Sequence, residues 1–396
     1  MRVLHVVTAF PRSPDDVIIP WLVELLQRLR ERGCEVEILT SAYRGGGNTE
    51  YRGIPVHRFR YFPRRWEDLT HDESVPDRLK RSFRYKLAAV CYVLAGMAAA
   101  WRLARRRRYD LVHVHWAMPH ALFGWAARAA CGARSVTTFY GVELRWTRSA
   151  LGPLQWLLIR AARKSDRAVA ISRHTAEDVR ALAGVETEVI PYGVGLPSPA
   201  PSSAFDVHTG PFTVLFVGRL VERKGVGVLL DAAARLSPLQ DFRVVIVGDG
   251  PERPALEARA ARLGLAAVVQ FRGRVSEEEL VRAYATSQVC VLPAVVDRRG
   301  DTEGLGVVLL EAMTHGVPVI GSNVGGITDI VTDGETGLLV PPGDAEALAG
   351  AITRLQRDPA LTARLRAAGP RRVEERFTWD AIVAKWEAVY RTVLTA

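Results

Sequence analysis

The sequence predicts an α/β protein with two parallel sheets, each covered by helices on both faces. The chain has 396 residues, more than one hydrophobic core usually holds. Short β-branched runs alternate with helical patterns in the first half. The alternation stops at a stretch rich in Pro, Gly and Ser, residues 191–211, and then begins again. Strands that alternate with helices of this length form parallel sheets, so we expect two doubly wound domains joined by a short, stiff hinge.

In the first half, apolar and β-branched runs predict strands at Arg2–Thr8, Cys34–Thr40, Pro55–Phe59, Asp110–His115, Arg134–Phe139, Ala168–Ile171 and Thr187–Ile190. Helical periodicity between them predicts helices at Ile18–Arg32, Asp77–Arg105, Pro119–Cys131, Leu151–Lys164 and Arg173–Ala183. The longest apolar run, Leu87–Trp101, is shorter than the roughly 20 residues that span a bilayer. We therefore interpret it as part of a buried helix.

In the second half, continuous apolar runs predict buried parallel strands at Thr213–Gly218, Arg243–Gly248, Val268–Phe271, Val289–Leu292 and Val317–Ile320. Helices are expected at Gly227–Leu236, Pro254–Leu263, Glu277–Thr286, Gly306–His315 and Ala345–Gln356. The last stretch, Trp379–Leu394, has the pattern of an amphipathic helix.

Composition narrows the class of protein. With 48% hydrophobic and 24% charged residues, the chain is ordinary globular material. Its four cysteines are scattered and form no CxxC pair, which argues against a zinc cluster or a disulfide framework and favours a reducing compartment. The N-terminus enters a strand-like segment without the apolar region of a signal peptide. We expect a cytoplasmic protein.

The net charge of +10 is unevenly distributed. Between Pro76 and Arg167 basic residues far outnumber acidic ones, and Arg102 and Arg105–Arg108 form the tightest cluster. Such a patch can hold phosphates or anionic lipid head groups, which would allow peripheral contact with the inner face of a membrane. The alternative is a solvated face in a chain that prefers Arg throughout. No nucleic-acid module is recognised, so nucleic acid is not an expected partner.

The first strand of the second half ends in a basic loop. Arg219 and Lys224 follow that strand and precede a helix. Arg as a planar fork and Lys as a point charge can grip a diphosphate, and both can neutralise it as a leaving group. A solvated basic loop is the alternative. Gly248-Asp249-Gly250 does not complete GxGxxG, and no GxxxxGK[ST] occurs. The sequence therefore lacks the motifs that identify dinucleotide oxidoreductases and P-loop NTPases.

The stretch Asp301–Ala312 carries two carboxylates, Glu303 and Glu311, eight positions apart. Eight helical residues rise about 12 Å. Glycines after Glu303 leave backbone N–H groups uncovered at the start of a helix, where anions bind. These features suit a long, anionic, polyhydroxylated ligand such as a nucleotide sugar. A solvated loop and a buried helix with one satisfied Glu would give the same pattern.

In combination these motifs become specific. The order Val217-Gly218-Arg219, Lys224-Gly225, Gly248-Asp249-Gly250-Pro251, Glu303-Gly304, Glu311-Ala312-Met313 and Val324-Gly325-Gly326 resembles the family-4 retaining glycosyltransferases of the GT-B fold (glycosyl transferases group 1). The resemblance implies two Rossmann-like domains facing a cleft. It assigns acceptor binding to residues 1–205, donor binding to residues 206–376, and a helix that crosses back to the first domain to residues 377–396. It also implies transfer of a hexosyl group from a UDP- or GDP-sugar to a hydroxyl of a glycan, a glycolipid or a small-molecule natural product, with no metal and no cofactor.

The resemblance also assigns roles to residues. Arg219 and Lys224 would hold the donor diphosphate, Glu303 would contact the donor sugar, and these three form the expected catalytic set. Glu311 would bind the ribose hydroxyls of the donor. The remaining donor contacts would come from Gly248, Arg274, Val275, Gly304, Leu305 and Gly306.

The first half matches the family less well. The loop Ala9–Asp16 contains no glycine where relatives carry a Gly-Gly pair, and Tyr140 stands where many have a His. Tyr can donate a hydrogen bond to a sugar but is a poor base near neutral pH. The residues expected around the acceptor are Phe10, His120, Tyr140, Glu143 and Ser172, although capping of a helix would also explain Ser172.

His113 and His115 alternate along a predicted strand, so both imidazoles should face the same side. A metal site would need a third ligand, which the sequence does not place, so histidines of a core or a cleft are expected. Three alternative functions remain open for this chain: a nucleotide-sugar epimerase, a phosphorylase and a non-catalytic nucleotide-sugar-binding protein.

Overall fold

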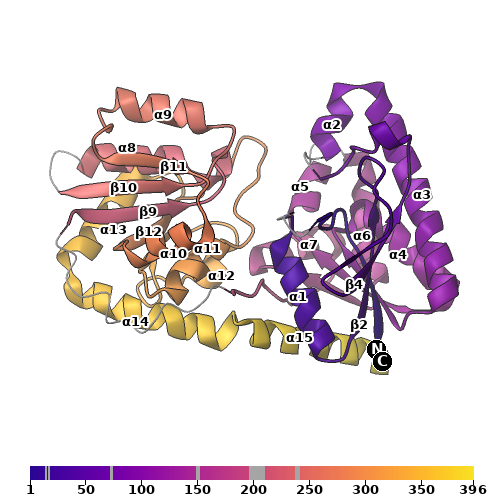
Figure 1. Ribbon diagram of the computed structural model, residues 1–396. Helices are drawn as coiled ribbons and strands as arrows, with labels where there is room; N and C mark the ends of the chain where they lie inside the picture. The colour runs from indigo at the N-terminus through magenta and orange to yellow at the C-terminus, as the bar shows by residue number, and fades with distance from the viewer. Residues whose placement is uncertain (14–15, 17, 72–74, 149–151, 196–209, 237–240) are drawn as a thin grey trace. The chain divides into compact units, whose positions relative to one another are not determined.

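The computed structural model describes residues 1–13, 16, 18–71, 75–148, 152–195, 210–236 and 241–396. It divides into two compact units: Met1–Gly193 with Trp379–Ala396, and Val194–Thr378. Each unit has a sheet of mainly parallel strands with helices on both faces (Figure 1). The boundary expected at residue 205, and most of the expected hinge, lie outside the described residues.

The first unit contains an eight-stranded sheet in the order β3-β4-β2-β1-β5-β6-β7-β8. Every pair is parallel except β3–β4. The strands are β1 (Arg2–Val6), β2 (Glu35–Ser41), β3 (Thr49–Tyr51), β4 (Ile54–Phe59), β5 (Leu111–His115), β6 (Arg134–Phe139), β7 (Arg167–Ala170) and β8 (Glu188–Val189). The order of strands along the chain reverses between β1 and β5, so the carboxyl ends of these neighbours flank a switch point, where ligands of doubly wound sheets bind.

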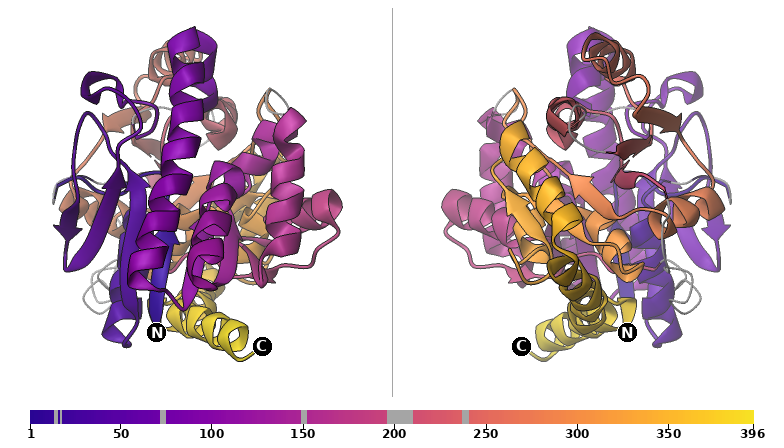
Figure 2. Two further views of the ribbon diagram at one scale, coloured as in Figure 1. Left: turned by 90° about the vertical axis from the view of Figure 1, so that its right-hand side faces the viewer. Right: turned by 90° about the vertical axis from the view of Figure 1, so that its left-hand side faces the viewer.

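The first unit's α-helices are α1 (Pro20–Glu31), α2 (Val75–Arg81), α3 (Phe83–Arg107), α4 (Ala117–Cys131), α5 (Val142–Arg148), α6 (Gln155–Lys164), α7 (Arg173–Ala183) and α15 (Trp379–Thr395). Helices α1 and α15 pack with Val3 and Leu111 on one face of the sheet. Helices α3 and α4 pack with Leu4 and Val112 on the other face (Figure 2). Alternate strand residues therefore enter two different cores, which explains the continuous apolar runs.

The prediction of one continuous helix over Asp77–Arg105 is wrong, and the interpretation of Leu87–Trp101 as part of a buried helix holds for one helix face only. The backbone is extended at Ser82 and separates α2 from α3. One face of α3 is buried, through Tyr85, Ala88, Tyr92, Gly96, Ala100 and Ala104, whereas Phe83, Leu87, Val90, Leu94 and Trp101 on another face are exposed. Within the described residues, α3 is the one helix long and apolar enough, by length and composition alone, to cross a membrane, yet only 28% of its most apolar window is buried.

The second unit contains six parallel strands in the order β11-β10-β9-β12-β13-β14. They are β9 (Phe212–Val217), β10 (Phe242–Val247), β11 (Val269–Gly273), β12 (Val289–Leu292), β13 (Val319–Ser322) and β14 (Leu338–Val340). The helices are α8 (Val226–Leu236), α9 (Arg253–Arg262), α10 (Glu277–Ala285), α11 (Val307–Thr314), α12 (Ile327–Ile330), α13 (Ala345–Arg357) and α14 (Pro359–Arg376). Numbered along the chain, the strand order is 3-2-1-4-5-6, typical of Rossmann-like sheets, with the switch point between β9 and β12.

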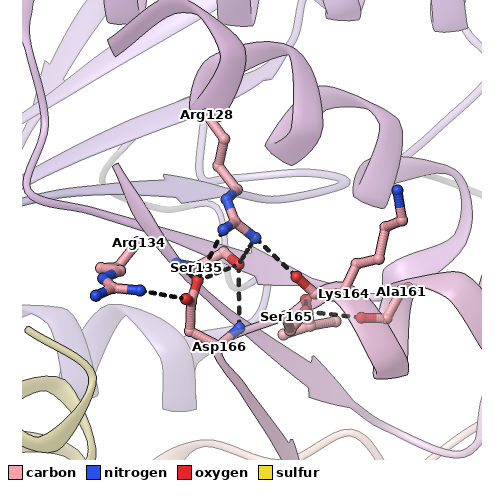
Figure 3. A network of polar contacts seen from close by, with 8 residues as sticks. Arg128, Arg134, Ser135, Ala161, Lys164, Ser165 and Asp166 are labelled. Atoms are coloured by element: carbon pink, nitrogen blue, oxygen red, sulfur yellow. Dashed lines mark hydrogen bonds and ion pairs between the residues drawn. The ribbon is translucent and has the colours of Figure 1, made fainter. Parts of the chain in front are cut away.

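The amino ends of β6 and β7 are fastened by one carboxylate (Figure 3). Asp166 accepts hydrogen bonds from the Ser135 backbone N–H at 2.8 Å and from Arg134 Nη1 at 3.0 Å, and Arg128 Nη2 lies 3.2 Å away. Burial alone would raise the pKa of Asp166, but these donors outweigh it and lower the pKa overall. The network lies at the edge opposite the switch point, so it stabilises the sheet away from any ligand.

Candidate active site

The switch point of the second unit brings together two of the predicted site residues. Lys224 follows β9 and Glu303 follows β12, the neighbouring strand. Lys224 Nζ lies 2.6 Å from Glu303 Oε2, and both side chains are only 12% exposed. A lysine and a carboxylate placed on adjacent loops at this edge can face the phosphate and sugar parts of one ligand.

The loop before α8 is held in position by a glycine. Residues Glu222–Lys224 form a 3-10 turn that ends at Gly225, which has φ +69°. A Cβ at Gly225 would overlap the carbonyl oxygen of Pro293, so the loop packs directly against the segment that follows β12. The Val295 N–H donates to the Arg223 carbonyl at 2.9 Å and fixes the same approach. This close packing places Lys224 opposite Glu303.

The surroundings of Glu303 keep it ionised. Burial would raise the pKa of its carboxyl, but Lys224, Arg223 and the Leu305 N–H together hold the pKa below its usual value. Arg223 Nη1 lies 3.8 Å from Glu303 Oε2, and Arg223 Nε lies 3.4 Å from Asp301 Oδ2. Sequence reasoning missed Arg223, although its position in the same turn as Lys224 was a signal. The site therefore holds two cations and two carboxylates before any ligand binds.

Glu311 is held differently. It lies on α11, and its Oε2 accepts a hydrogen bond from the Tyr284 hydroxyl at 2.8 Å. Burial raises the pKa of Glu311, with Tyr284 and Lys224 acting in the opposite direction. Tyr284 itself is fully buried and stacks on His315 at 5.2 Å. The Tyr284 hydroxyl therefore orients the Glu311 carboxyl, which is suited to accept from a ligand hydroxyl, and Tyr284 is a second residue that the sequence analysis missed.

The other predicted donor contacts lie at the same edge of the sheet. Gly248 follows β10, while Arg274 and Val275 follow β11. Arg219 is exposed and forms no ion pair with any residue that the structure describes. Helix α11 begins after Gly306 without a side-chain cap, which leaves its first N–H groups open to an anion.

The switch point of the first unit contains an apolar pocket of about 390 Å³. Thr8 and Ala9, which follow β1, line it together with Trp116 and His120, which follow β5. His120 is buried, with Nε2 3.0 Å from the Tyr92 hydroxyl, and burial lowers the pKa of His120 to about 4. The predicted acceptor residue His120 thus lines a pocket and is neutral at physiological pH.

Tyr140 belongs to a buried chain of hydrogen bonds. Its hydroxyl lies 2.6 Å from His115 Nδ1, and His115 Nε2 lies 3.0 Å from His5 Nδ1. Burial raises the pKa of Tyr140 and lowers that of His115. The Tyr140 hydroxyl is therefore occupied and unsuited to act as a base, although its ring stacks on Trp116 at 4.4 Å.

The third histidine that the sequence could not place is His5. His5, His113 and His115 bring ring nitrogens within 4.8 Å of one another. His113 bonds to the Tyr390 hydroxyl and to Thr138, each at 2.7 Å. Apart from His5 Nε2, all ring nitrogens of the three histidines have hydrogen-bond partners, so the arrangement is a hydrogen-bonded core cluster.

Three other predicted acceptor residues have structural partners. Phe10 is fully buried, packs edge-on against Tyr51 and does not line the pocket. Glu143 is buried and accepts the Tyr140 N–H at 3.0 Å, and burial raises its pKa to about 7. Ser172 caps α7 by accepting the Thr175 N–H at 3.2 Å, as the capping interpretation predicted.

Comparison with known proteins gives two family matches. Residues 21–196 match "Glycosyltransferase Family 4", and residues 202–372 match "Glycosyl transferases group 1". The phosphatidyl-myo-inositol mannosyltransferase of Mycobacterium leprae is 34% identical over 73% of this chain and 75% of its own. The D-inositol 3-phosphate glycosyltransferase of Streptomyces scabiei is 30% identical over 94% of this chain and 86% of its own.

Solved structures share the fold. Sucrose-phosphate synthase from Thermosynechococcus elongatus superposes with a TM-score of 0.79 at 24% identity, over 100% of this chain and 99% of that one. The Anabaena protein HepE, solved with UDP, gives 0.73 at 20% identity, over 99% and 100%. The family matches, together with the shared fold, define a glycosyltransferase of the GT-B class. More narrowly, the chain belongs to glycosyltransferase family 4.

Proposed function

We propose that this enzyme transfers a hexosyl group from a UDP- or GDP-sugar to a hydroxyl, with retained configuration and without a metal ion. The observation that carries the proposal is the Lys224–Glu303 pair at the switch point, 2.6 Å apart, on the loops that follow β9 and β12. It supplies a cation for a diphosphate beside a carboxylate for a sugar. A GDP-mannose-dependent relative from Mycolicibacterium smegmatis, 33% identical over 82% of this chain, supports a nucleotide-sugar donor.

The residues would divide the donor among them. Arg219 and Lys224 bind the diphosphate, and the open N–H groups around Gly304, Leu305 and Gly306 add to that site. Glu303 accepts from sugar hydroxyls and Glu311 from the ribose. The nucleobase lies by Arg274 and Val275, near Gly248.

In the chemical step, the acceptor oxygen forms a bond to the anomeric carbon on the face that the phosphate leaves. The bond from that carbon to the phosphate oxygen breaks, and the acceptor proton passes to the departing phosphate. Arg219 and Lys224 neutralise the charge that develops there, which is the task a metal ion performs in other transferases. Tyr140 takes no part as a base, because its hydroxyl is bonded to His115.

The acceptor would be a glycan, a glycolipid or a small-molecule hydroxyl. Names of relatives include phosphatidyl-myo-inositol and D-inositol 3-phosphate as the molecules they act on, which favours a polar head group that carries phosphate. We place the enzyme in the cytoplasm, with the basic cluster around Arg102 and Arg105–Arg108 in peripheral contact with the anionic inner face of a membrane.

The test is a donor panel. Purified protein is mixed with UDP-, GDP- and dTDP-sugars and an acceptor extract, with EDTA, and nucleoside diphosphate release is followed. We expect one donor to be consumed, and Arg219→Met to lower the rate about 100-fold. Arg235→Met is the matched control, because Arg235 is exposed at the end of α8. Consumption of no donor, or equal rates for both variants, would refute the proposal.

A further inference from the structure

Helix α3 presents an apolar stripe to solvent. Its exposed large apolar residues are spaced by three, four or seven positions, which places them on one helix face: Phe83, Leu87, Val90, Leu94 and Trp101. Phe83 is 78% exposed and Leu94 is 62% exposed. Figure 2 shows α3 along the outside of the first unit, with its outer side uncovered by other helices of that unit. Contiguous exposed apolar surface of this kind marks a binding face.

The charges around the stripe select an anionic partner. No Asp or Glu occurs between Asp77 and Asp110. Exposed cations lie before and along the first turn and at the end of α3: Lys80, Arg81, Lys86, Arg102, Arg105, Arg106, Arg107 and Arg108. An apolar helix face bordered by Lys and Arg is the pattern of helices that lie in the interface of an anionic bilayer.

The opposite side of α3 borders the pocket at the first unit's switch point. Ala89, Tyr92 and Val93 of α3 line the pocket, together with Val75 and Leu79 of α2. Its volume of about 390 Å³ lies within the range, roughly 300–1,000 Å³, of small-molecule pockets. The hydroxyl of Tyr92 is bonded to His120, so these two polar groups satisfy each other and the lining offers an occupant mainly carbon atoms.

We propose that this pocket binds the hydrocarbon chain of a membrane lipid whose head group carries the acceptor hydroxyl, while the stripe on α3 lies in the bilayer interface. The inference rests on the proposed function and narrows its acceptor to a lipid. One helix would contact the bilayer with one face and the lipid chain with the other. The pocket opens between the carboxyl ends of β1 and β5, the place in a doubly wound sheet where a substrate is expected.

The first test uses a fluorescent fatty acid, 11-(dansylamino)undecanoic acid, with the full-length protein. We expect saturable binding with enhanced emission, weakened at least tenfold in Ala89→Phe, which fills the pocket. Val93→Phe provides a second filling variant. Ala255→Phe, on exposed α9, is the matched control. Alkyl carboxylates that compete for the site should gain affinity roughly fourfold per methylene until the pocket is full.

The second test uses vesicles of phosphatidylcholine alone or with 30% phosphatidylglycerol. We expect flotation only with the anionic vesicles, and loss of flotation but not of probe binding when Leu87 and Leu94 are both changed to Ser. Absence of probe binding, or equal binding by both filling variants and wild type, would overturn the pocket assignment. Probe binding without flotation would overturn the lipid source in favour of a soluble apolar molecule.

The two proposals fail separately. Protection of the same preparation against heat by UDP or GDP reports on donor binding, and release of nucleoside diphosphate reports on transfer; neither measurement uses the fluorescent probe. If the donor is consumed but the probe does not bind, the proposed function stands and the lipid inference fails. If the protein binds the probe and floats with anionic vesicles but consumes no donor, the transferase proposal fails and the lipid site remains.

Discussion

Replacing Lys224 with Met tests the central ion pair, because the change keeps the length of the side chain and removes its charge. Breaking one side of a buried pair costs about 3–5 kcal/mol when the remaining charge has no other partner. Glu303 keeps Arg223 Nη1 at 3.8 Å and the Leu305 N–H. We therefore expect a smaller loss of unfolding free energy, about 2 kcal/mol at pH 7.5, and a transfer rate lower by about 100-fold or more.

The pH dependence should change sign. In the wild type the pKa of Glu303 is below its usual value, so its contribution to stability is present above that value and is lost as the pH falls. In Lys224→Met, the lysine no longer counteracts the rise in pKa that burial causes, so we expect the pKa of Glu303 to lie above its usual value. Stability of the variant then falls as the pH rises. The difference between the two proteins should grow from pH 5 to pH 8.

Urea unfolding followed by far-UV circular dichroism measures this difference. All nine tryptophans lie in the first unit, so tryptophan fluorescence reports on that unit and should be unchanged in the variant. Lys164→Met, at an exposed lysine, is the matched control. A loss below about 0.5 kcal/mol, the level of an ordinary surface change, or an unchanged pH profile would refute the assignment of Lys224 and Glu303 as a buried pair.

Three further variants give independent outcomes. Because burial raises the pKa of Glu143 to about 7, the wild type should lose about 2–3 kcal/mol of stability between pH 5 and pH 8 through this group, and Glu143→Gln should not, measured by tryptophan fluorescence in urea. Asp166→Asn should cost about 1–2 kcal/mol at pH 7. That cost should vanish as the pH falls through the lowered pKa of Asp166, and a constant cost down to pH 3 would contradict the network. Glu311→Ala should weaken binding of UDP or GDP about tenfold or more in calorimetry, and unchanged affinity would place the ribose elsewhere.

The sequence predicted most of the two sheets because buried parallel strands leave continuous apolar runs, and their ends mark where loops carry function. That reasoning found Lys224 and Glu303, since each follows a strand. It did not find helix α14, because Gly369-Pro370 in its middle has the composition of a break. It also described α3 as buried, because an apolar run does not reveal which of its faces meets a neighbour.

Long-range pairing explains the remaining differences at the site. His5 joins His113 and His115 only because β1 and β5 are neighbours in the sheet, more than 100 residues apart in sequence. Phe10 lies in the loop after β1, where a residue that contacts the acceptor is expected, yet its side chain packs in the core against Tyr51. Spacing along the chain fixes which loop a residue occupies but not the direction of its side chain.

The most direct test of the central claim is a proton NMR spectrum of the reaction with the donor that the panel identifies. With EDTA present, we expect the anomeric signal of an α-linked donor to disappear while free nucleoside diphosphate and an α-linked product form in equal amounts. A β-linked product, or no reaction without a divalent metal, would contradict the mechanism built on Arg219, Lys224 and Glu303.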